Sequence, residues 1–196
     1  MRIKVLTFNL WLGGGQVNFA KVIEAIQASG ADIVCLQEPA GNTARIAALL
    51  GWPYALPSRH VIARVPLFAP PIALGPDGNE LAIAYAEVSP GGFVAIACIH
   101  LPSEESGSRA LRNGGTVAQA LEMERRVRWP AIAPYVAPAT AMARAGLPGS
   151  IAFDGNALAR RDGIGDGAVA WPAMQALLDA GFTDSYRAAH PDPKAR

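Results

Sequence analysis

The sequence predicts a layered α/β fold in which buried strands end in polar residues. Three short stretches are strongly apolar, and runs of this kind are typical of strands buried on both faces. Residues 32–38 end in Glu38, residues 93–100 end in His100, and residues 150–156 end with Asp154 and Asn156. Burying such groups deep in an apolar core is costly, so we expect them at the strand ends, where ligand sites collect in α/β folds.

The composition is that of a single globular domain, which we place at residues 1–196. Of its 196 residues, 51% are hydrophobic and 17% charged, which is enough apolar material for a substantial core. The net charge is +1, so the chain has no general field to attract a polyanion. No apolar run reaches the ~18 residues of a membrane span, and no signal-peptide pattern opens the chain, so we expect a cytoplasmic protein.

The first fifty residues predict alternating strands and helices. A strand over residues 3–11 is followed by three glycines, and a helix then begins with Asn18 as its cap and ends at Gly30. The strand over residues 32–38 comes next, and a helix over residues 42–50 closes at Gly51. This order is typical of an α/β opening.

The middle of the chain predicts successive strands, and helices return towards the end. We expect strands at residues 60–64, 71–74, 81–88 and 93–100, with a hairpin turn at residues 89–92. A capping box at residues 116–119 opens a helix that Pro130 should end or kink, and Arg125, Arg126 and Arg128 are interpreted as its solvated face. A Gly- and Arg-rich loop covers residues 159–167, and its resemblance to a dinucleotide motif is discounted because no strand precedes it. The last helix runs from Pro172 to a stop at Gly181.

Each polar strand-end residue also has an ordinary structural interpretation. Glu38 is either a functional acid or a helix cap. His100 is either a proton donor or a strand-end histidine whose hydrogen bonds are satisfied within the protein. Asn9 either satisfies backbone groups, holds the Glu38 carboxylate or completes a magnesium shell. Asp154 and Asn156 belong either to a site or to an Asp-Gly-Asn turn. Taken together, these residues indicate a divalent-metal site that acts on a phosphate.

With these residues identified, the chain resembles the endonuclease/exonuclease/phosphatase superfamily, which has the fold of pancreatic deoxyribonuclease. The resemblance spans essentially the whole chain, and its motifs come in family order. They are Thr7-Phe8-Asn9, the segment 32–38 that ends in Glu38, residues 61–66 with Arg64, His100-Leu101, residues 153–157 and residues 180–187.

The resemblance implies a four-layer α/β sandwich, with two mixed sheets face to face and helices outside. It also implies hydrolysis of a phosphoester bond by water attack on a metal-polarised phosphate. The near-neutral charge favours a small phosphoester over long nucleic acid as substrate. The implied roles are Glu38 and Asn9 for Mg²⁺, with Mn²⁺ as the alternative ion; His100 at the phosphoryl group; Asp154 for the nucleophile; and Asn156, His100 and Arg64 for substrate phosphate.

The chain also departs from the family pattern. Phe153 and Gly155 stand where Gly and Phe are usual, and Ala63 replaces a Ser. The family continues with further strands that carry another acid and an Asp-His pair, so we expect a C-terminally incomplete domain. The alternatives are a fragment of an active hydrolase and an inactive remnant that binds a phosphorylated ligand or a protein. Missing strands would leave a sheet edge open to self-association.

Overall fold

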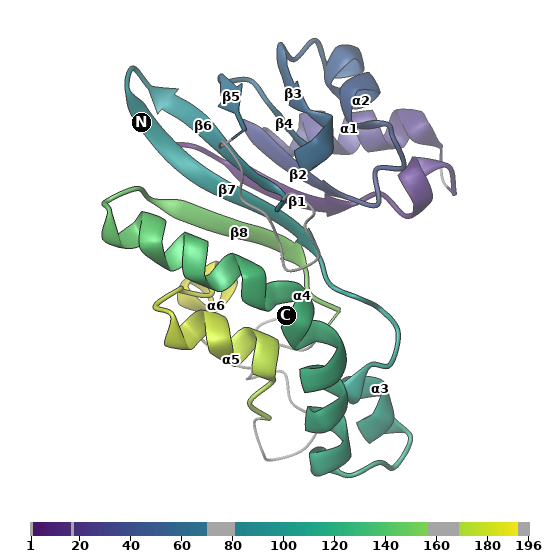
Figure 1. Ribbon diagram of the computed structural model, residues 1–196. Coiled ribbons are helices and arrows are strands. Elements are labelled where there is room, and N and C mark those ends of the chain that lie inside the picture. The colour runs from purple at the N-terminus through teal and green to yellow at the C-terminus, as the bar shows by residue number, and fades with distance from the viewer. Residues whose placement is uncertain (1, 17, 70–80, 157–168, 192–196) are drawn as a thin grey trace. The chain divides into compact units, whose positions relative to one another are not determined.

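A computed structural model of the chain describes residues 2–16, 18–69, 81–156 and 169–191 (Figure 1). The chain divides into two compact units, Met1–His100 with Ala141–Asp154 and Leu101–Thr140 with Gly155–Arg196. The strand expected at residues 71–74 and the loop at residues 159–167 lie outside the described residues. Among the helices described, none is long and apolar enough to cross a membrane.

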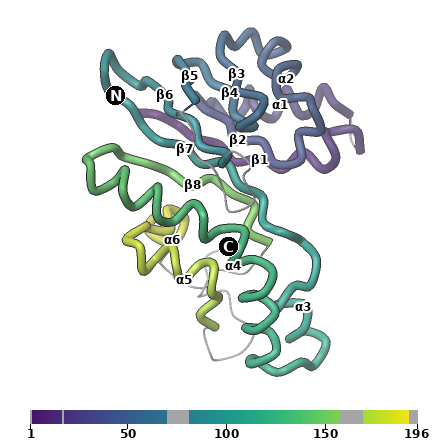
Figure 2. Tube along the Cα trace, viewed as in Figure 1, coloured from purple at the N-terminus to yellow at the C-terminus, as the bar shows by residue number. Residues whose placement is uncertain are grey.

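The first unit contains two four-stranded sheets, each with parallel and antiparallel pairs. The first sheet has the order β1 (Val5–Asn9), β2 (Ile33–Gln37), β4 (Val61–Ala63) and β3 (Tyr54–Leu56). The second has the order β5 (Leu67–Phe68), β6 (Ile83–Ser89), β7 (Gly92–His100) and β8 (Gly149–Asp154). The pairs β1–β2 and β7–β8 are parallel, and the course of these strands can be followed in Figure 2. The prediction of two mixed sheets with helices is confirmed.

The side chains of β2 explain why the sheets lie face to face. Every residue of this strand is buried, as its unbroken apolar sequence predicts. Ile33 and Cys35 pack into a core with residues of the second sheet, among them Ile96 and Cys98. Because neighbouring side chains point to opposite faces of a strand, Val34 and Leu36 pack into a different core, on the outer face.

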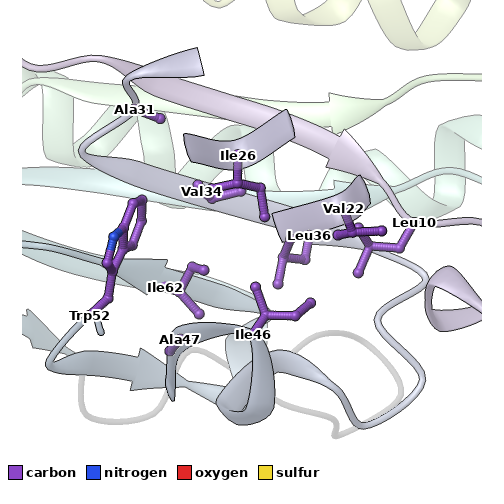
Figure 3. Close-up of a cluster of buried hydrophobic side chains, with 10 residues drawn as sticks. All are labelled: Leu10, Val22, Ile26, Ala31, Val34, Leu36, Ile46, Ala47, Trp52 and Ile62. Carbon is purple, nitrogen blue, oxygen red and sulfur yellow. The ribbon is translucent and has the colours of Figure 1, made fainter. Parts of the chain in front are cut away.

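Two helices cover that outer face, α1 (Phe19–Ser29) and α2 (Thr43–Leu50). The predicted signals set the ends of α1, because Asn18 Oδ1 accepts a hydrogen bond from Ala20 N and Gly30 adopts a left-handed conformation with φ 63°. Figure 3 shows Val22 and Ile26 of α1 and Ile46 of α2 directed at the same apolar cluster as Leu36.

Backbone conformation explains where β1 ends and where β6 turns into β7. β1 ends at Asn9 instead of Trp11, since Trp11 and Leu12 have positive φ values of 49° and 55° and cannot extend a strand. A 3-10 helix, η1 (Leu12–Gly14), follows.

The predicted hairpin is confirmed, with Pro90 and Gly91 between β6 and β7 and Gly91 at φ 70°. β3 and a second 3-10 helix, η2 (Pro57–Arg59), were not predicted.

The second unit is helical in its described part. It contains α3 (Gly107–Arg112), α5 (Pro172–Asp179), α6 (Ser185–Ala189) and most of α4 (Val117–Arg144). The capping box is confirmed, because Gln119 Oε1 accepts from Thr116 N and Gln119 N donates to Thr116 Oγ1. Of the end or kink expected at Pro130, the end is wrong: α4 continues through Pro130, Pro134 and Pro138. Burial of side chains such as Ile132 outweighs the local cost of each proline.

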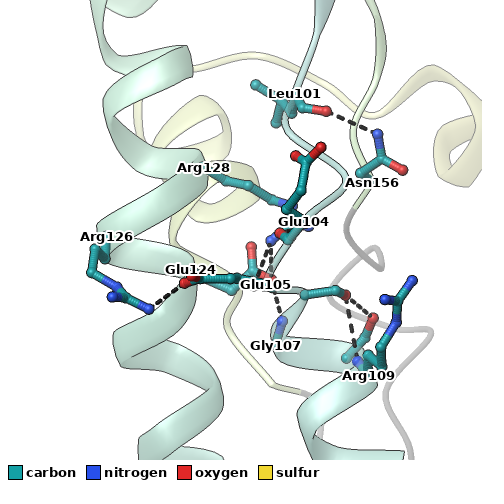
Figure 4. Close-up of polar contacts among 11 residues, drawn as sticks. Leu101, Glu104, Glu105, Gly107, Arg109, Glu124, Arg126, Arg128 and Asn156 are labelled. Carbon is teal, nitrogen blue, oxygen red and sulfur yellow. Dashed lines mark hydrogen bonds and ion pairs between the residues drawn. The ribbon is translucent and has the colours of Figure 1, made fainter.

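Arg128 was expected on a solvated helix face, and this expectation is wrong. Its side chain is fully buried, and its Nη1 lies 2.9 Å from Glu124 Oε1, one helical turn earlier. The same Glu124 oxygen accepts from Gly107 N, and Arg128 donates to the carbonyls of Glu104 and Glu105 (Figure 4). The pair therefore holds the segment before α3 against α4, whereas the neighbouring Arg126 is exposed and pairs with Glu105.

The outer apolar cluster gives a stability prediction. Ile26 is completely buried in it, so Ile26→Ala should lower the free energy of unfolding by about 2–5 kcal/mol through lost burial and a cavity. Leu49→Ala makes a comparable change at a residue 54% exposed and should change stability by less than ~0.5 kcal/mol. Urea unfolding followed by circular dichroism measures both, and equal effects would show that this cluster does not stabilise the unit.

Candidate active site

Four of the predicted polar residues meet at the carboxyl ends of strands in the first unit. Asn9 ends β1, Glu38 follows β2, and His100 and Asp154 are paired as the last residues of β7 and β8. Because β1–β2 and β7–β8 are both parallel, the two strands of each pair deliver their polar residues to the same edge of their sheet. The sandwich then brings the residues of both sheets together.

The carboxamide of Asn9 links the two carboxylates. Its Nδ2 lies 3.0 Å from Glu38 Oε1 and 2.9 Å from Asp154 Oδ2, and its Oδ1 accepts from Trp11 N at 2.8 Å. The reversed amide would set its oxygen against two carboxylates and its NH₂ against an N–H donor, so hydrogen bonding fixes the orientation. Asn9 therefore holds the two carboxylates, which is one of the roles that the sequence left open.

The backbone after β1 fixes the other side of Glu38. Leu12 N donates to Glu38 Oε2 at 2.8 Å, and Gly13 N donates to the Glu38 carbonyl at 2.8 Å. Gly13 has φ 75°, and a Cβ there would lie 2.9 Å from Ala40 Cβ, so only glycine fits this close approach. Sequence reasoning had missed these backbone donors, although the three glycines after Trp11 were the available signal.

These contacts lower the pKa of Glu38. The hydrogen bond from Asn9 is the largest cause, the Leu12 N–H is the next, and the nearby His100 contributes further. Partial desolvation and the neighbouring Asp154 carboxylate oppose the shift without reversing it. A carboxylate held in its charged form in this way suits cation binding.

His100 lies beside both acids. Its Nε2 is 3.9 Å from Glu38 Oε1 and 3.8 Å from Asp154 Oδ2. The side chains of His100, Glu38 and Asp154 are 31%, 26% and 32% exposed, so a ligand can reach all three from solvent. The arrangement supplies two anionic oxygens and an imidazole next to each other.

The donor set fits a hard divalent cation. Two carboxylate oxygens lie within hydrogen-bonding distance of one amide nitrogen, and a cation bound to them would relieve their mutual repulsion. Magnesium prefers oxygen ligands and keeps several waters, so one or two carboxylates suffice. In the part of the chain that the structure describes, no group of three or more His, Cys, Asp or Glu residues forms a metal cage.

Of the two remaining predicted residues, Arg64 lies elsewhere in the first unit, and Asn156 belongs to the second unit. Arg64 is not brought to this cluster: β4 runs antiparallel to β2 and Arg64 N donates to Asp32 O, so Arg64 lies at the opposite end of β2 from Glu38. Its guanidinium lies over the Trp52 ring, 5.1 Å from the centroid. Asn156 belongs to the second unit, where its Nδ2 donates to the Leu101 carbonyl at 2.8 Å (Figure 4).

A two-sheet α/β sandwich with an acid–amide–imidazole cluster at its strand ends is a fold and site suited to phosphoester chemistry. The model of the Endonuclease/Exonuclease/phosphatase family matches residues 6–170 of the chain. The chain therefore belongs to this family, as the sequence resemblance predicted, and the family is associated with phosphoester hydrolysis in general. No curated protein and no solved structure matches the chain.

The Asn9 bridge predicts the titration of Glu38. Removing the amide in Asn9→Ala should raise the pKa of Glu38 from its lowered value. A Glu38 pKa that is lower in the folded than in the unfolded protein stabilises the fold at pH values above about 4.3, the ordinary pKa of Glu. This stabilisation is lost as the pH falls through the pKa of the folded protein. The variant should therefore lose less stability than the wild type on acidification over that range. NMR titration of ¹³C-labelled Glu carboxyls and urea midpoints measure the two effects.

Asn18→Ala serves as the control, because the Asn18 side chain caps α1 by accepting from Ala20 N. It should lower stability at every pH and leave the Glu38 titration unchanged. An unshifted Glu38 pKa in Asn9→Ala would contradict the assigned hydrogen bond.

Proposed function

We propose that the chain is a divalent-metal-dependent hydrolase of phosphoester bonds. The observation that carries this proposal is the pair of carboxylates, Glu38 and Asp154, held on the Asn9 amide with His100 beside them. Membership of the family supports the same reaction class. Mg²⁺ is the proposed ion, with Mn²⁺ as the alternative.

Each residue has a proposed role that its contacts support. Glu38 would hold the metal, because its charged form is already favoured in the protein. Asn9 would keep Glu38 and Asp154 in place, and its Oδ1, which has a second lone pair beside the bond from Trp11 N, would complete the shell of the metal. Asp154 would accept a hydrogen bond from the attacking water and orient it, and His100 would donate to an oxygen of the phosphoryl group. For Asn156, contact with a phosphate oxygen is proposed from the sequence resemblance alone.

The metal, when bound, would polarise the phosphate and offset the charge that develops on it. The protein itself would position the groups that hold the metal and the substrate. Leu12 N and the Asn9 amide prevent Glu38 from turning away, so the site is ordered before the substrate arrives. Preorganised dipoles and charges of this kind lower a barrier without reorganisation during the reaction.

An assay with Mg²⁺ or Mn²⁺ on chromogenic phosphodiesters and phosphomonoesters tests the proposal. Glu38→Gln should lower kcat/KM by at least ~10²-fold, because the metal's electrostatic contribution is lost. His100→Ala should lower it by about 10²–10⁴-fold. A chelator should abolish turnover, and added metal should restore it.

Glu24→Gln is the matched control, since Glu24 lies on α1 and pairs with Lys21 at the surface. Its activity should equal that of the wild type. Folded protein without metal-dependent turnover on either substrate would favour the second candidate, an inactive member that binds a phosphorylated ligand or a protein.

Self-association through an open sheet edge is a further part of the proposal. Within the described strands, β1 lies at the edge of its sheet, paired with β2 alone. Lys4 O accepts from Asp32 N, and Leu10 N donates to Gln37 O. Backbone groups alternate in direction along a strand, so those of the intervening Thr7 face away from β2. An unpaired row of this kind can pair with a second copy of the chain.

Light scattering after size-exclusion chromatography, over a wide range of protein concentration, tests this pairing. Thr7→Pro removes the outward N–H and should shift the protein to monomer. Thr7→Val keeps the N–H while losing the hydroxyl contact with Gln37, so it should associate like the wild type. A wild-type protein that is monomeric at every concentration would refute the edge pairing.

A further inference from the structure

We propose that a pocket beside Glu38 and His100 binds the organic group of the phosphoester, and that this group is compact, uncharged and largely apolar. We call this cavity of about 420 Å³ the side pocket. The inference rests on the proposed function, because it places the phosphoryl group at Glu38 and His100. The side pocket is lined by Leu36, Gln37, Glu38, Pro39, Ala40, Gly41, His60, Cys98, Ile99 and His100.

The position of the side pocket makes it the continuation of the candidate site. Its lining includes the carboxyl ends of β2 and β7, the strands that deliver Glu38 and His100. His60 precedes β4, and its carbonyl accepts from Leu36 N at 2.9 Å, which ties this part of the lining to β2. A phosphoester bound at Glu38 and His100 therefore has a concave space of ligand size next to its phosphorus atom.

The lining is mostly apolar and has one buried polar group. Pro39 and Ile99 are apolar and buried. Gln37 is only 2% exposed; its Oε1 accepts from the Thr7 hydroxyl at 3.1 Å, and its Nε2 donates to Cys98 Sγ at 3.6 Å. A thiol is a weak acceptor, so the Gln37 amide retains capacity for a polar atom of a ligand.

The charges of the side pocket argue against an anionic ligand group. Neither Lys nor Arg occurs among the residues that line it, and Glu38 contributes a carboxylate. Desolvation lowers the pKa of His60, which favours the neutral imidazole. With Glu38 and the metal that it would hold engaged by the phosphoryl group, a second phosphate or a polyanionic chain would find no Lys or Arg among the lining residues to offset its charge.

The wall at residues 38–41 has a fixed and unusual shape. Glu38, Ala40 and Gly41 all have positive φ values, of 53°, 45° and 80°, and His60 on the rim has φ 56°. Positive φ costs free energy for residues other than glycine, and such conformations cluster at ligand-binding sites. This observation supports a ligand-binding role for the same residues that form the cavity.

Two non-hydrolysable ligands that differ only in the organic group test the inference. Isothermal titration calorimetry in Mg²⁺ buffer should show phenylphosphonate binding about tenfold more tightly than methylphosphonate, since the phenyl ring leaves water for the side pocket. Ala40→Phe, which fills the pocket, should remove this preference. Ala48→Phe makes the same change on the exposed side of α2 and should retain it. (4-Carboxyphenyl)phosphonate should lose the advantage of phenylphosphonate through its added charge.

A second variant tests the side pocket independently, in case Ala40→Phe misfolds. His60→Asn removes the imidazole while Asn tolerates the positive φ, and it should reduce the preference for phenylphosphonate. Equal affinities for the two ligands, no binding of phenylphosphonate, or an unchanged preference in Ala40→Phe and His60→Asn would overturn the inference. Turnover without a phenyl preference refutes the side pocket alone, and a phenyl preference without turnover refutes the proposed function alone.

Discussion

The hydrogen bonds of one amide, that of Asn9, are the constraint on which the rest of the site depends. The two carboxylates that it binds come from different sheets, Glu38 after β2 and Asp154 at the end of β8. Two acids at this separation repel each other, and a neutral double donor between them offsets that repulsion. Because Trp11 N fixes the amide oxygen, the arrangement has one orientation.

The apolar core makes this geometry possible. β2 is buried on both faces, with one set of side chains between the sheets and the other under α1 and α2. A one-residue slip would exchange these sets, so burial fixes the register of β2 firmly. Since Glu38 directly follows β2, the same packing that stabilises the sandwich also places the acid.

The helical unit shows the reverse case, in which packing overrides local signals. A proline often ends a helix, yet α4 passes through three of them and buries Ile132 beyond the first. Arg128 belongs to a charged segment typical of a solvated face, but Glu124 one turn earlier provides a partner that permits its burial. Hydrogen bonds to backbone groups at Glu104, Glu105 and Gly107 offset part of the cost of burying the pair.

The sequence by itself determined the elements whose signals are local, together with the family. The cap at Asn18, the stop at Gly30, the hairpin at Gly91 and the buried strands all depend on neighbouring residues, and the polar residues at the strand ends follow from them. Only the tertiary structure decided which of these residues meet. The antiparallel direction of β4 carries Arg64 away from Glu38, and the backbone N–H of Leu12 reaches Glu38 through a positive-φ turn. Strand direction and backbone hydrogen bonds across 26 residues of chain arise from packing between distant segments, which no local pattern records.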